Sequence, residues 1–251
     1  MGMTVCQAVC DDPSLELVAA VDPHHVGIDV RQLGIRGGAI QVARTADALS
    51  AAGAEVAVDF TVIDAARENL EWCADHGVHA VVGTSGFSAE EAEKLAARFE
   101  SSDANAAIIP NFAISAVLMM KFAELAAPFF DTAEIIELHH DDKVDAPSGT
   151  AIATAERMAE ASSDWAPDPT TKTVLEGARG GEGAGGIAIH SVRLRGLVAH
   201  QEVLLGTTGQ TLSIRQDSYD RTSYMPGVVR AVKAVGTKPG LTFGLDALLG
   251  L

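Results

Sequence analysis

The chain has 251 residues, 47% of them hydrophobic and 21% charged, and these proportions are typical of a globular protein that buries a core. Its formal net charge of −16 argues against nucleic acid or an anionic membrane surface as a partner. The cysteines Cys6, Cys10 and Cys73 lack the spacing of zinc ligands and indicate reduced thiols. No apolar run is long enough to span a membrane and no secretion signal opens the chain, so we expect a cytoplasmic protein.

The first half of the chain alternates short apolar runs with helical patterns. Ser88 and Glu91 form a capping box that predicts the start of one of these helices. The alternation predicts a Rossmann-like, doubly wound parallel sheet that binds its ligand at the carboxyl ends of the strands. We expect strands at 15–22, 55–61, 78–84 and 106–112, and helices at 64–77 and 88–102.

The start of the chain departs from the dinucleotide-binding pattern. That pattern needs a strand, a Gly-rich turn and then a helix, whereas Met1 and Gly2 lead directly into the helical sequence MTVCQAV. The first strand of the sheet is therefore expected to be missing. Asp22 ends the strand predicted at 15–22, where an acid that holds the ribose hydroxyls would stand, although Pro23 also makes it a plausible turn residue.

The second half of the chain has a different pattern, in which a long helix precedes a strand, a second helix and a Gly-rich loop at 177–186. Three further strands then predict an antiparallel meander within a mixed sheet, and a last helix at 226–235 is expected to pack on the first domain. The helices are expected at 114–130 and 151–161, and the strands at 134–140, 187–195, 199–207 and 211–218. The expected domains are a dinucleotide-binding domain, 1–112 and 222–251, and an α+β substrate-binding and oligomerisation domain, 113–221.

The segment 134–151, EIIELHHDDKVDAPSGTA, is the strongest candidate for an active site. His139 and His140 stand where a strand ends, Lys143 lies in the following loop, and Ser148 opens a helix whose first N–H groups are unpaired. Each feature alone is common in structural roles. Together they suit a small dianionic substrate that needs proton transfer.

A metal site is the alternative use of the same segment. His139, His140, Asp141 and Asp142 have suitable ligand atoms, but adjacent residues of a strand cannot readily converge on one ion. Lys143 would also repel a cation. We therefore expect no metal.

The same segment resembles the signature E-x-x-E-x-H-H-x-x-K-x-D-x-P-S-G-T-A of the 4-hydroxy-tetrahydrodipicolinate reductase (dihydrodipicolinate reductase) family, in the diaminopimelate route to lysine. Further segments extend the resemblance over nearly the whole chain, in family order: VVGTSGF (81–87), IIPNFAISAV (108–117) and HSVRLRGLVAHQEVLLG (190–206). The resemblance implies reduction of a cyclic, unsaturated dicarboxylate by NADH or NADPH.

The resemblance also implies roles for individual residues. His139 would donate and accept the proton, and Lys143 would be a second proton donor that also binds a carboxylate. His140 would contact the substrate, and Gly149 and Thr150 would hold a carboxylate at the helix end. The family further implies a homotetramer built through the sheets of the substrate domain.

Cofactor contacts follow from the resemblance alone. Gly2 matches the end of the family's Gly-rich loop, which implies that about a dozen preceding residues are absent, through a wrongly chosen start or a truncation. Asp22 without a neighbouring Arg favours tolerance of NADH. The other matched positions are Gly83, Thr84, Ser85, Ile109, Pro110, Asn111 and Phe112, with Ser85 and Ile109 departing from the family pattern.

Two other classes of protein remain open at this point. One is a different Rossmann-type dehydrogenase, for which His139 and Lys143 would still serve. The other is a non-catalytic sensor of a nucleotide or ligand, which the missing strand makes conceivable.

Overall fold

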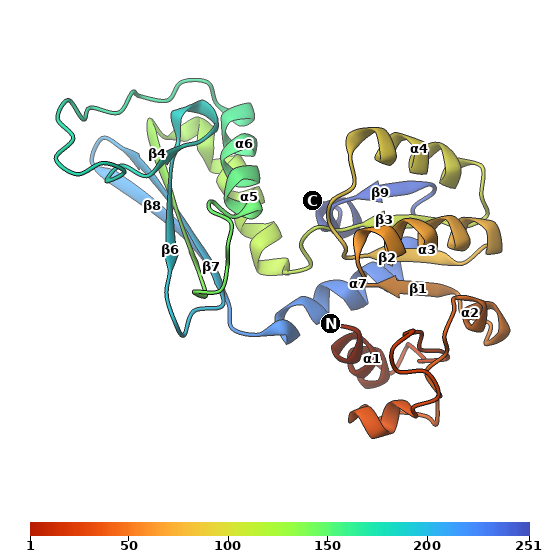
Figure 1. The fold of residues 1–251 in the computed structure, drawn as a ribbon. Helices are drawn as coiled ribbons and strands as arrows, with labels where there is room; N and C mark the ends of the chain where they lie inside the picture. Colours follow the sequence, from red (N-terminus) through yellow and green to blue (C-terminus); the bar gives the residue numbers. More distant parts are fainter. The chain divides into compact units, whose positions relative to one another are not determined.

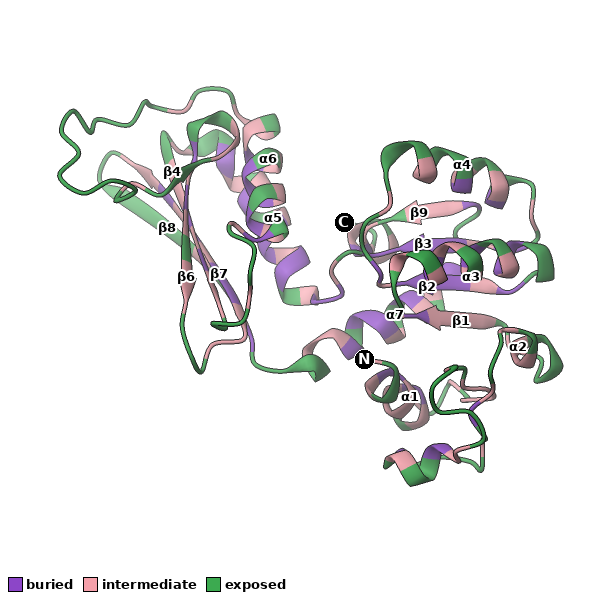
Figure 2. Cartoon of the chain, viewed as in Figure 1, coloured by how far each residue is buried: buried purple, intermediate pink, exposed green.

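The computed structural model describes all residues from 1 to 251. They form two compact units, one made of Met1–Phe112 and Tyr224–Leu251, the other of Ala113–Ser223 (Figure 1). Buried residues concentrate along the strands and the helix faces that cover them in each unit (Figure 2). No helix has the length and apolarity needed to cross a membrane.

Unit 1 contains a four-stranded sheet in which every neighbouring pair is parallel. Its strands, in spatial order, are β1 (Val56–Asp59), β2 (His79–Val82), β3 (Ala106–Ile108) and β9 (Leu241–Phe243). The parallel, Rossmann-like sheet expected from the alternating pattern is confirmed. β9 was not anticipated, because three residues after Gly240 give too short a pattern to distinguish a strand from a loop.

Helices cover both faces of this sheet. α3 (Ile63–His76) and α4 (Ala89–Glu100) share a buried cluster with alternate residues of β2 and β3. α7 (Met225–Val235) contacts the same two strands, and the short α8 (Leu245–Leu249) packs on α7. The predicted packing of the last helix on the first domain is therefore confirmed.

The capping box that begins α4 forms as predicted. Ser88 Oγ accepts a hydrogen bond from Glu91 N at 3.2 Å, and a carboxylate oxygen of Glu91 accepts one from Ser88 N at 2.7 Å. These reciprocal bonds satisfy N–H groups that a helix start otherwise leaves unpaired.

The N-terminal segment contains α1 (Gly2–Asp11), a 3₁₀ turn η1 (Val30–Leu33) and α2 (Asp47–Ala51). The predicted helix after Met1 is thus confirmed, but the strand predicted at 15–22 is wrong. Only Val21 forms a bridge, to Ala43, and no second strand lies alongside to extend the ladder. The apolar side chains of this run pack instead into a small cluster around Val30, Ile35 and Val42, so apolarity alone gave a false strand signal.

Unit 2 contains a mixed five-stranded sheet. In spatial order its strands are β5 (Gly181–Glu182), β6 (Ala188–Arg193), β4 (Thr132–His139), β7 (Ala199–Thr207) and β8 (Gln210–Ser218). The mixed sheet is confirmed, but the predicted meander of three consecutive strands is only partly right. β4 lies between β6 and β7, parallel to the first and antiparallel to the second, because pairing between distant segments leaves no mark on local pattern.

Two helices pack on one face of this sheet and on each other (Figure 1). α5 (Ile114–Ala126) continues into the 3₁₀ turn η2 (Ala127–Phe129) and contacts β8, whereas α6 (Gly149–Ala161) contacts β4. Ile135 and Val203, which pair across β4 and β7, are fully buried. The 3₁₀ turns η3 (Ala184–Gly186) and η4 (Arg221–Tyr224) lie in the remaining connections.

Candidate active site

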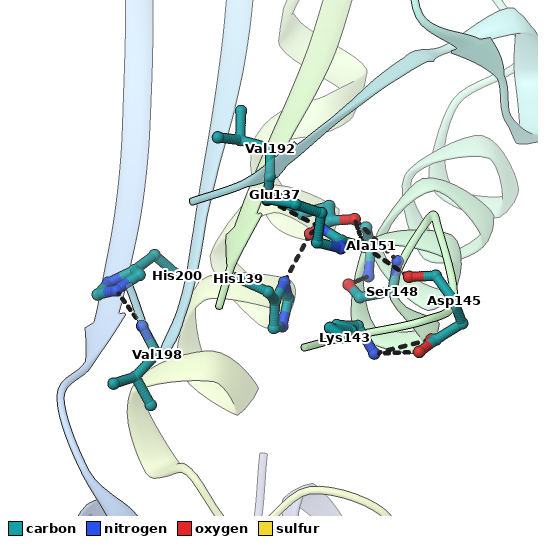
Figure 3. A network of polar contacts seen from close by, with 10 residues as sticks. Glu137, His139, Lys143, Asp145, Ser148, Ala151, Val192, Val198 and His200 are labelled. Atoms are coloured by element: carbon teal, nitrogen blue, oxygen red, sulfur yellow. Dashed lines mark hydrogen bonds and ion pairs between the residues drawn. The ribbon is translucent and has the colours of Figure 1, made fainter. Parts of the chain in front are cut away.

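The candidate active site of unit 2 lies at the carboxyl end of β4. Glu137 and His139 are two residues apart in an extended strand, so their side chains share one face of the sheet. His139 pairs with Arg193 of β6 on one side and with Ala199 of β7 on the other. The sheet therefore brings an arginine 54 positions away in sequence beside the histidine, as Figure 3 shows for the surrounding polar network.

Glu137 is the centre of this network. Its side chain is fully buried, and one oxygen accepts from His139 Nδ1 at 2.6 Å and from Arg193 Nη1 at 2.8 Å. The other oxygen accepts from Arg193 Nη2 at 2.8 Å and from Ser148 N at 3.2 Å. Burial pushes the pKa of Glu137 up, but hydrogen bonds from Arg193, Ser191 and His139 outweigh it and hold the pKa below its ordinary value.

His139 has a lowered pKa for the opposite balance of causes. Burial, which disfavours the imidazolium, is the largest effect. The hydrogen bond and charge of Glu137 raise the pKa, whereas Lys143 and Arg193 lower it further. The ring is therefore a titratable group whose charge state depends on three charged neighbours.

Lys143 is paired in the structure. Its Nζ donates to both carboxylate oxygens of Asp145 at 2.7 Å, and this contact lowers the pKa of Asp145 (Figure 3). The backbone of the same loop is held by Arg193, whose Nη2 donates to the carbonyl of Asp145 at 2.6 Å. A substrate carboxylate would compete with Asp145 for the lysine.

The N-terminus of α6 borders the same network. Ser148 caps it, with its Oγ accepting from Ala151 N at 3.2 Å. Gly149 is exposed, with open space around its Cβ position, and Thr150 is half-buried. His140 is exposed at the end of β4, where its carbonyl accepts from Lys143 N at 3.3 Å.

Unit 1 presents the loops at the carboxyl end of its sheet. Thr84 is almost buried and its hydroxyl lies 3.4 Å from an oxygen of Asp59 at the end of β1. A Cβ at Gly83 would lie 2.2 Å from the ring of Phe60, which itself packs on Phe112 with 5.3 Å between ring centroids. The structure thus gives Gly83 a packing reason, which the sequence did not reveal.

The next strand end supplies residues of differing accessibility. Ile109 and Phe112 belong to the buried core, so their side chains cannot reach a ligand. Pro110 and Ser85 are exposed and Asn111 is half-buried. Only part of the predicted cofactor set is therefore open to direct side-chain contact.

The first two predicted cofactor residues lie in the N-terminal segment. Gly2 is the exposed first residue of α1. Asp22 accepts from the backbone N–H of His24 at 2.8 Å and from His25 Nδ1 at 2.8 Å. The pKa of Asp22 is lowered, mainly by the His24 N–H, so the group is an ionised acceptor at neutral pH.

Sequence reasoning missed the roles of Glu137 and Arg193. The two-residue spacing between Glu137 and His139 in a strand could have indicated shared orientation. Arg193 gave no local signal, because its position beside His139 follows from the parallel pairing of β4 with β6.

Fold and site together define an oxidoreductase built from a Rossmann-like unit and an α+β unit that carries a histidine–lysine loop. The sequence matches the family described as "Dihydrodipicolinate reductase, N-terminus" over residues 1–112 and "Dihydrodipicolinate reductase, C-terminus" over residues 115–249. The chain belongs to the dihydrodipicolinate reductase family.

Individual relatives agree with this assignment. A protein of Mycobacterium marinum named 4-hydroxy-tetrahydrodipicolinate reductase is 56% identical over 81% of this chain and 83% of its own. One of the same name from Corynebacterium aurimucosum is 47% identical over 100% and 95%. The solved structure of a dipicolinate-bound dihydrodipicolinate reductase from Paenisporosarcina sp. superposes with a TM-score of 0.85 at 39% identity, covering 98% of this chain and 95% of that one.

A more distant likeness concerns the fold alone. An amine dehydrogenase of Mycobacterium smegmatis shares the architecture with a TM-score of 0.67 at 15% identity, over 98% of this chain and 92% of that chain.

Proposed function

We propose that this chain reduces 4-hydroxy-tetrahydrodipicolinate to tetrahydrodipicolinate with NADH or NADPH, as its relatives' names indicate for them. The observation that carries the proposal is the set formed by His139, Lys143 and the capped start of α6 at one end of the unit 2 sheet. A dicarboxylate needs cationic and N–H partners, and this set supplies both. The dipicolinate held by the Paenisporosarcina relative is a compound of the same class.

His139 is the proposed proton donor and acceptor, and Lys143 a second proton donor that also binds a substrate carboxylate. His140, exposed beside them, contacts the substrate, and the backbone and hydroxyl groups of Gly149 and Thr150 bind the other carboxylate. Since Asp145 already neutralises Lys143, substrate binding exchanges one carboxylate partner of the lysine for another.

The loops at the carboxyl end of the unit 1 sheet fit a nicotinamide nucleotide. Parallel sheets of this kind bind nucleotides at that end, and Gly83 leaves room there that a side chain would fill. Gly2, Asp22 and the positions Thr84, Ser85 and 109–112 complete the proposed set, with Ile109 and Phe112 acting through their backbones. When bound, the nicotinamide supplies the hydride.

Asp22 suits a free ribose hydroxyl better than a phosphate, which favours NADH. A homotetramer and a cytoplasmic location remain predictions from the family resemblance and the sequence.

The test is oxidation of NADH and of NADPH, each followed by absorbance with 4-hydroxy-tetrahydrodipicolinate present or omitted. Substrate-dependent oxidation is expected with both nucleotides. A chain that binds nucleotide but shows no substrate-dependent oxidation would be the non-catalytic sensor instead. Activity restricted to an amino acid or semialdehyde would assign it to another dehydrogenase class.

A further inference from the structure

Glu137 has no role in the proposed chemistry, yet it is the fully buried partner of the proposed proton donor. Each of its oxygens accepts a hydrogen bond from one Nη of Arg193 at 2.8 Å. An ionised carboxylate accepts hydrogen bonds and cannot donate them. The nitrogen that lies 2.6 Å from Glu137, Nδ1 of His139, must therefore carry a proton.

This contact fixes which nitrogen of His139 is available. With Nδ1 committed to Glu137, Nε2 is the nitrogen left without a hydrogen-bond partner in the structure (Figure 3). The other hydrogen bond of a histidine commonly sets its tautomer and ring orientation in this way.

We propose that Glu137 is the positioning residue of His139, holding Nδ1–H so that Nε2 exchanges the proton with the substrate, and that Arg193 keeps Glu137 ionised for this purpose. The inference rests on the proposed function and deepens it. Glu137 touches neither substrate nor cofactor and acts through His139.

The proton balance of the step follows from this geometry. In the imidazolium, Nδ1–H donates to Glu137 and Nε2–H faces the substrate. The Nε2–H bond breaks, its electron pair stays on Nε2, and the proton forms the new bond to the substrate. His139 is left neutral with Nδ1–H still on Glu137, and solvent returns a proton to Nε2.

Arg193 prevents a competing outcome. A buried carboxylate without a cation would favour taking the Nδ1 proton itself, because burial disfavours its charged form. Two hydrogen bonds from the guanidinium stabilise that charged form instead. Arg193 also ties the network to the carbonyl of Asp145, and hence to the loop of Lys143.

Strand β4 offers a matched control in Glu134. This residue also binds a histidine and an arginine, with one oxygen 2.8 Å from His190 Nε2 and the other contacted by Arg179. It lies three residues before Glu137, so it faces the opposite side of the sheet, and it is partly exposed. Changing it tests the loss of such a triad away from His139.

The kinetic test compares Glu137→Gln with Glu134→Gln. We expect Glu137→Gln to lower kcat by roughly 10- to 10³-fold, within the contribution of a general acid, and Glu134→Gln to leave it within about threefold. In a His139→Gln background, Glu137→Gln should add less than about threefold, because its effect passes through the histidine. Losses that multiply in the double variant would overturn the proposal.

The pH profile gives a second readout. The descending limb of kcat/KM that reports His139 should move to lower pH in Glu137→Gln, because the carboxylate that favours the imidazolium is gone. β7 presents only Ala199 opposite the ring, and the first turn of α6 has no charged side chain. The other charged groups facing His139 are those of Lys143, Asp145 and Arg193. An unmoved limb contradicts the proposal.

Nitrogen NMR of the histidine rings tests the tautomer in the unaltered protein, so the result does not depend on the variant folding. The expected signal is a neutral His139 protonated at Nδ1, and protonation at Nε2 would overturn the inference. If Glu137→Gln does not fold, Glu137→Gln with Arg193→Met removes both charges of the pair and replaces it in the kinetic test, with Arg193→Met alone as its reference. Inactivity of the unaltered protein would defeat the proposed function, while the NMR result would still judge the positioning role.

Discussion

Removal of Arg193 should destabilise unit 2 and reverse part of its acid response. Arg193→Met leaves Glu137 fully buried with the donors of His139 and Ser148 but without a cation. Losing one partner of a buried pair costs about 3–5 kcal/mol. We expect the lower end, because the arginine side chain is 20% exposed and its Nε is already buried without an acceptor.

A loss of about 3 kcal/mol corresponds to a fall of roughly 6–12 °C in the unfolding temperature. Differential scanning calorimetry at neutral pH measures it. Arg215→Met is the matched control, since Arg215 pairs with Asp217 and Glu202 but is 45% exposed, and such a surface pair contributes at most about 1 kcal/mol. Equal losses in the two variants would refute the reasoning.

The pH dependence has opposite signs in the two proteins. Glu137 has a lowered pKa when folded, so its contribution to stability is present above its unfolded pKa, about 4.3, and is lost as the pH falls through the folded pKa. In Arg193→Met, burial dominates and raises the folded pKa above that value. The variant should therefore regain stability relative to the unaltered protein as the pH falls from neutral toward about 4.3. A gap that stays constant over this range would show that Glu137 is not the affected group.

Three further changes test the proposed site. His139→Gln should lower kcat by roughly 10² to 10⁴ with little effect on nucleotide affinity, and a variant with near-full kcat would remove His139 from the mechanism. Lys143→Ala should impair both kcat and KM, and Lys143→Arg should restore KM better than kcat because arginine does not release its proton; full recovery of kcat would leave only an anchoring role. Asp145→Asn should lower the KM for the dicarboxylate by up to about fivefold by freeing Lys143 from an exposed pair, whereas a raised KM would show that Asp145 is needed to hold the lysine.

Local pattern was sufficient to predict the strand, loop and helix that carry the site. β4 alternates, α6 begins after Pro147 at a serine cap, and α4 begins with a capping box. These signals depend on residues within four positions of one another, so they survive in a single sequence.

Pairing between distant segments was not predictable in the same way. β4 lies between β6 and β7, so the partner of Glu137 comes from Arg193, 56 positions away. The apolar run at 15–22 shows the converse error, because a strand exists only where a neighbour accepts its hydrogen bonds, and here a single bridge forms.

The two glutamates of β4 show why residue type and spacing could not assign function alone. Glu134 and Glu137 each bind one histidine and one arginine, so their partners are chemically alike. Their surroundings differ, because Glu137 is fully buried whereas the side chain of Glu134 is 34% exposed. Solvent screens the contacts of Glu134, while those of Glu137 act at full strength on a histidine with an open nitrogen. Burial, set by the packing of α6 on one face of the sheet, thus separates a positioning carboxylate from a surface one.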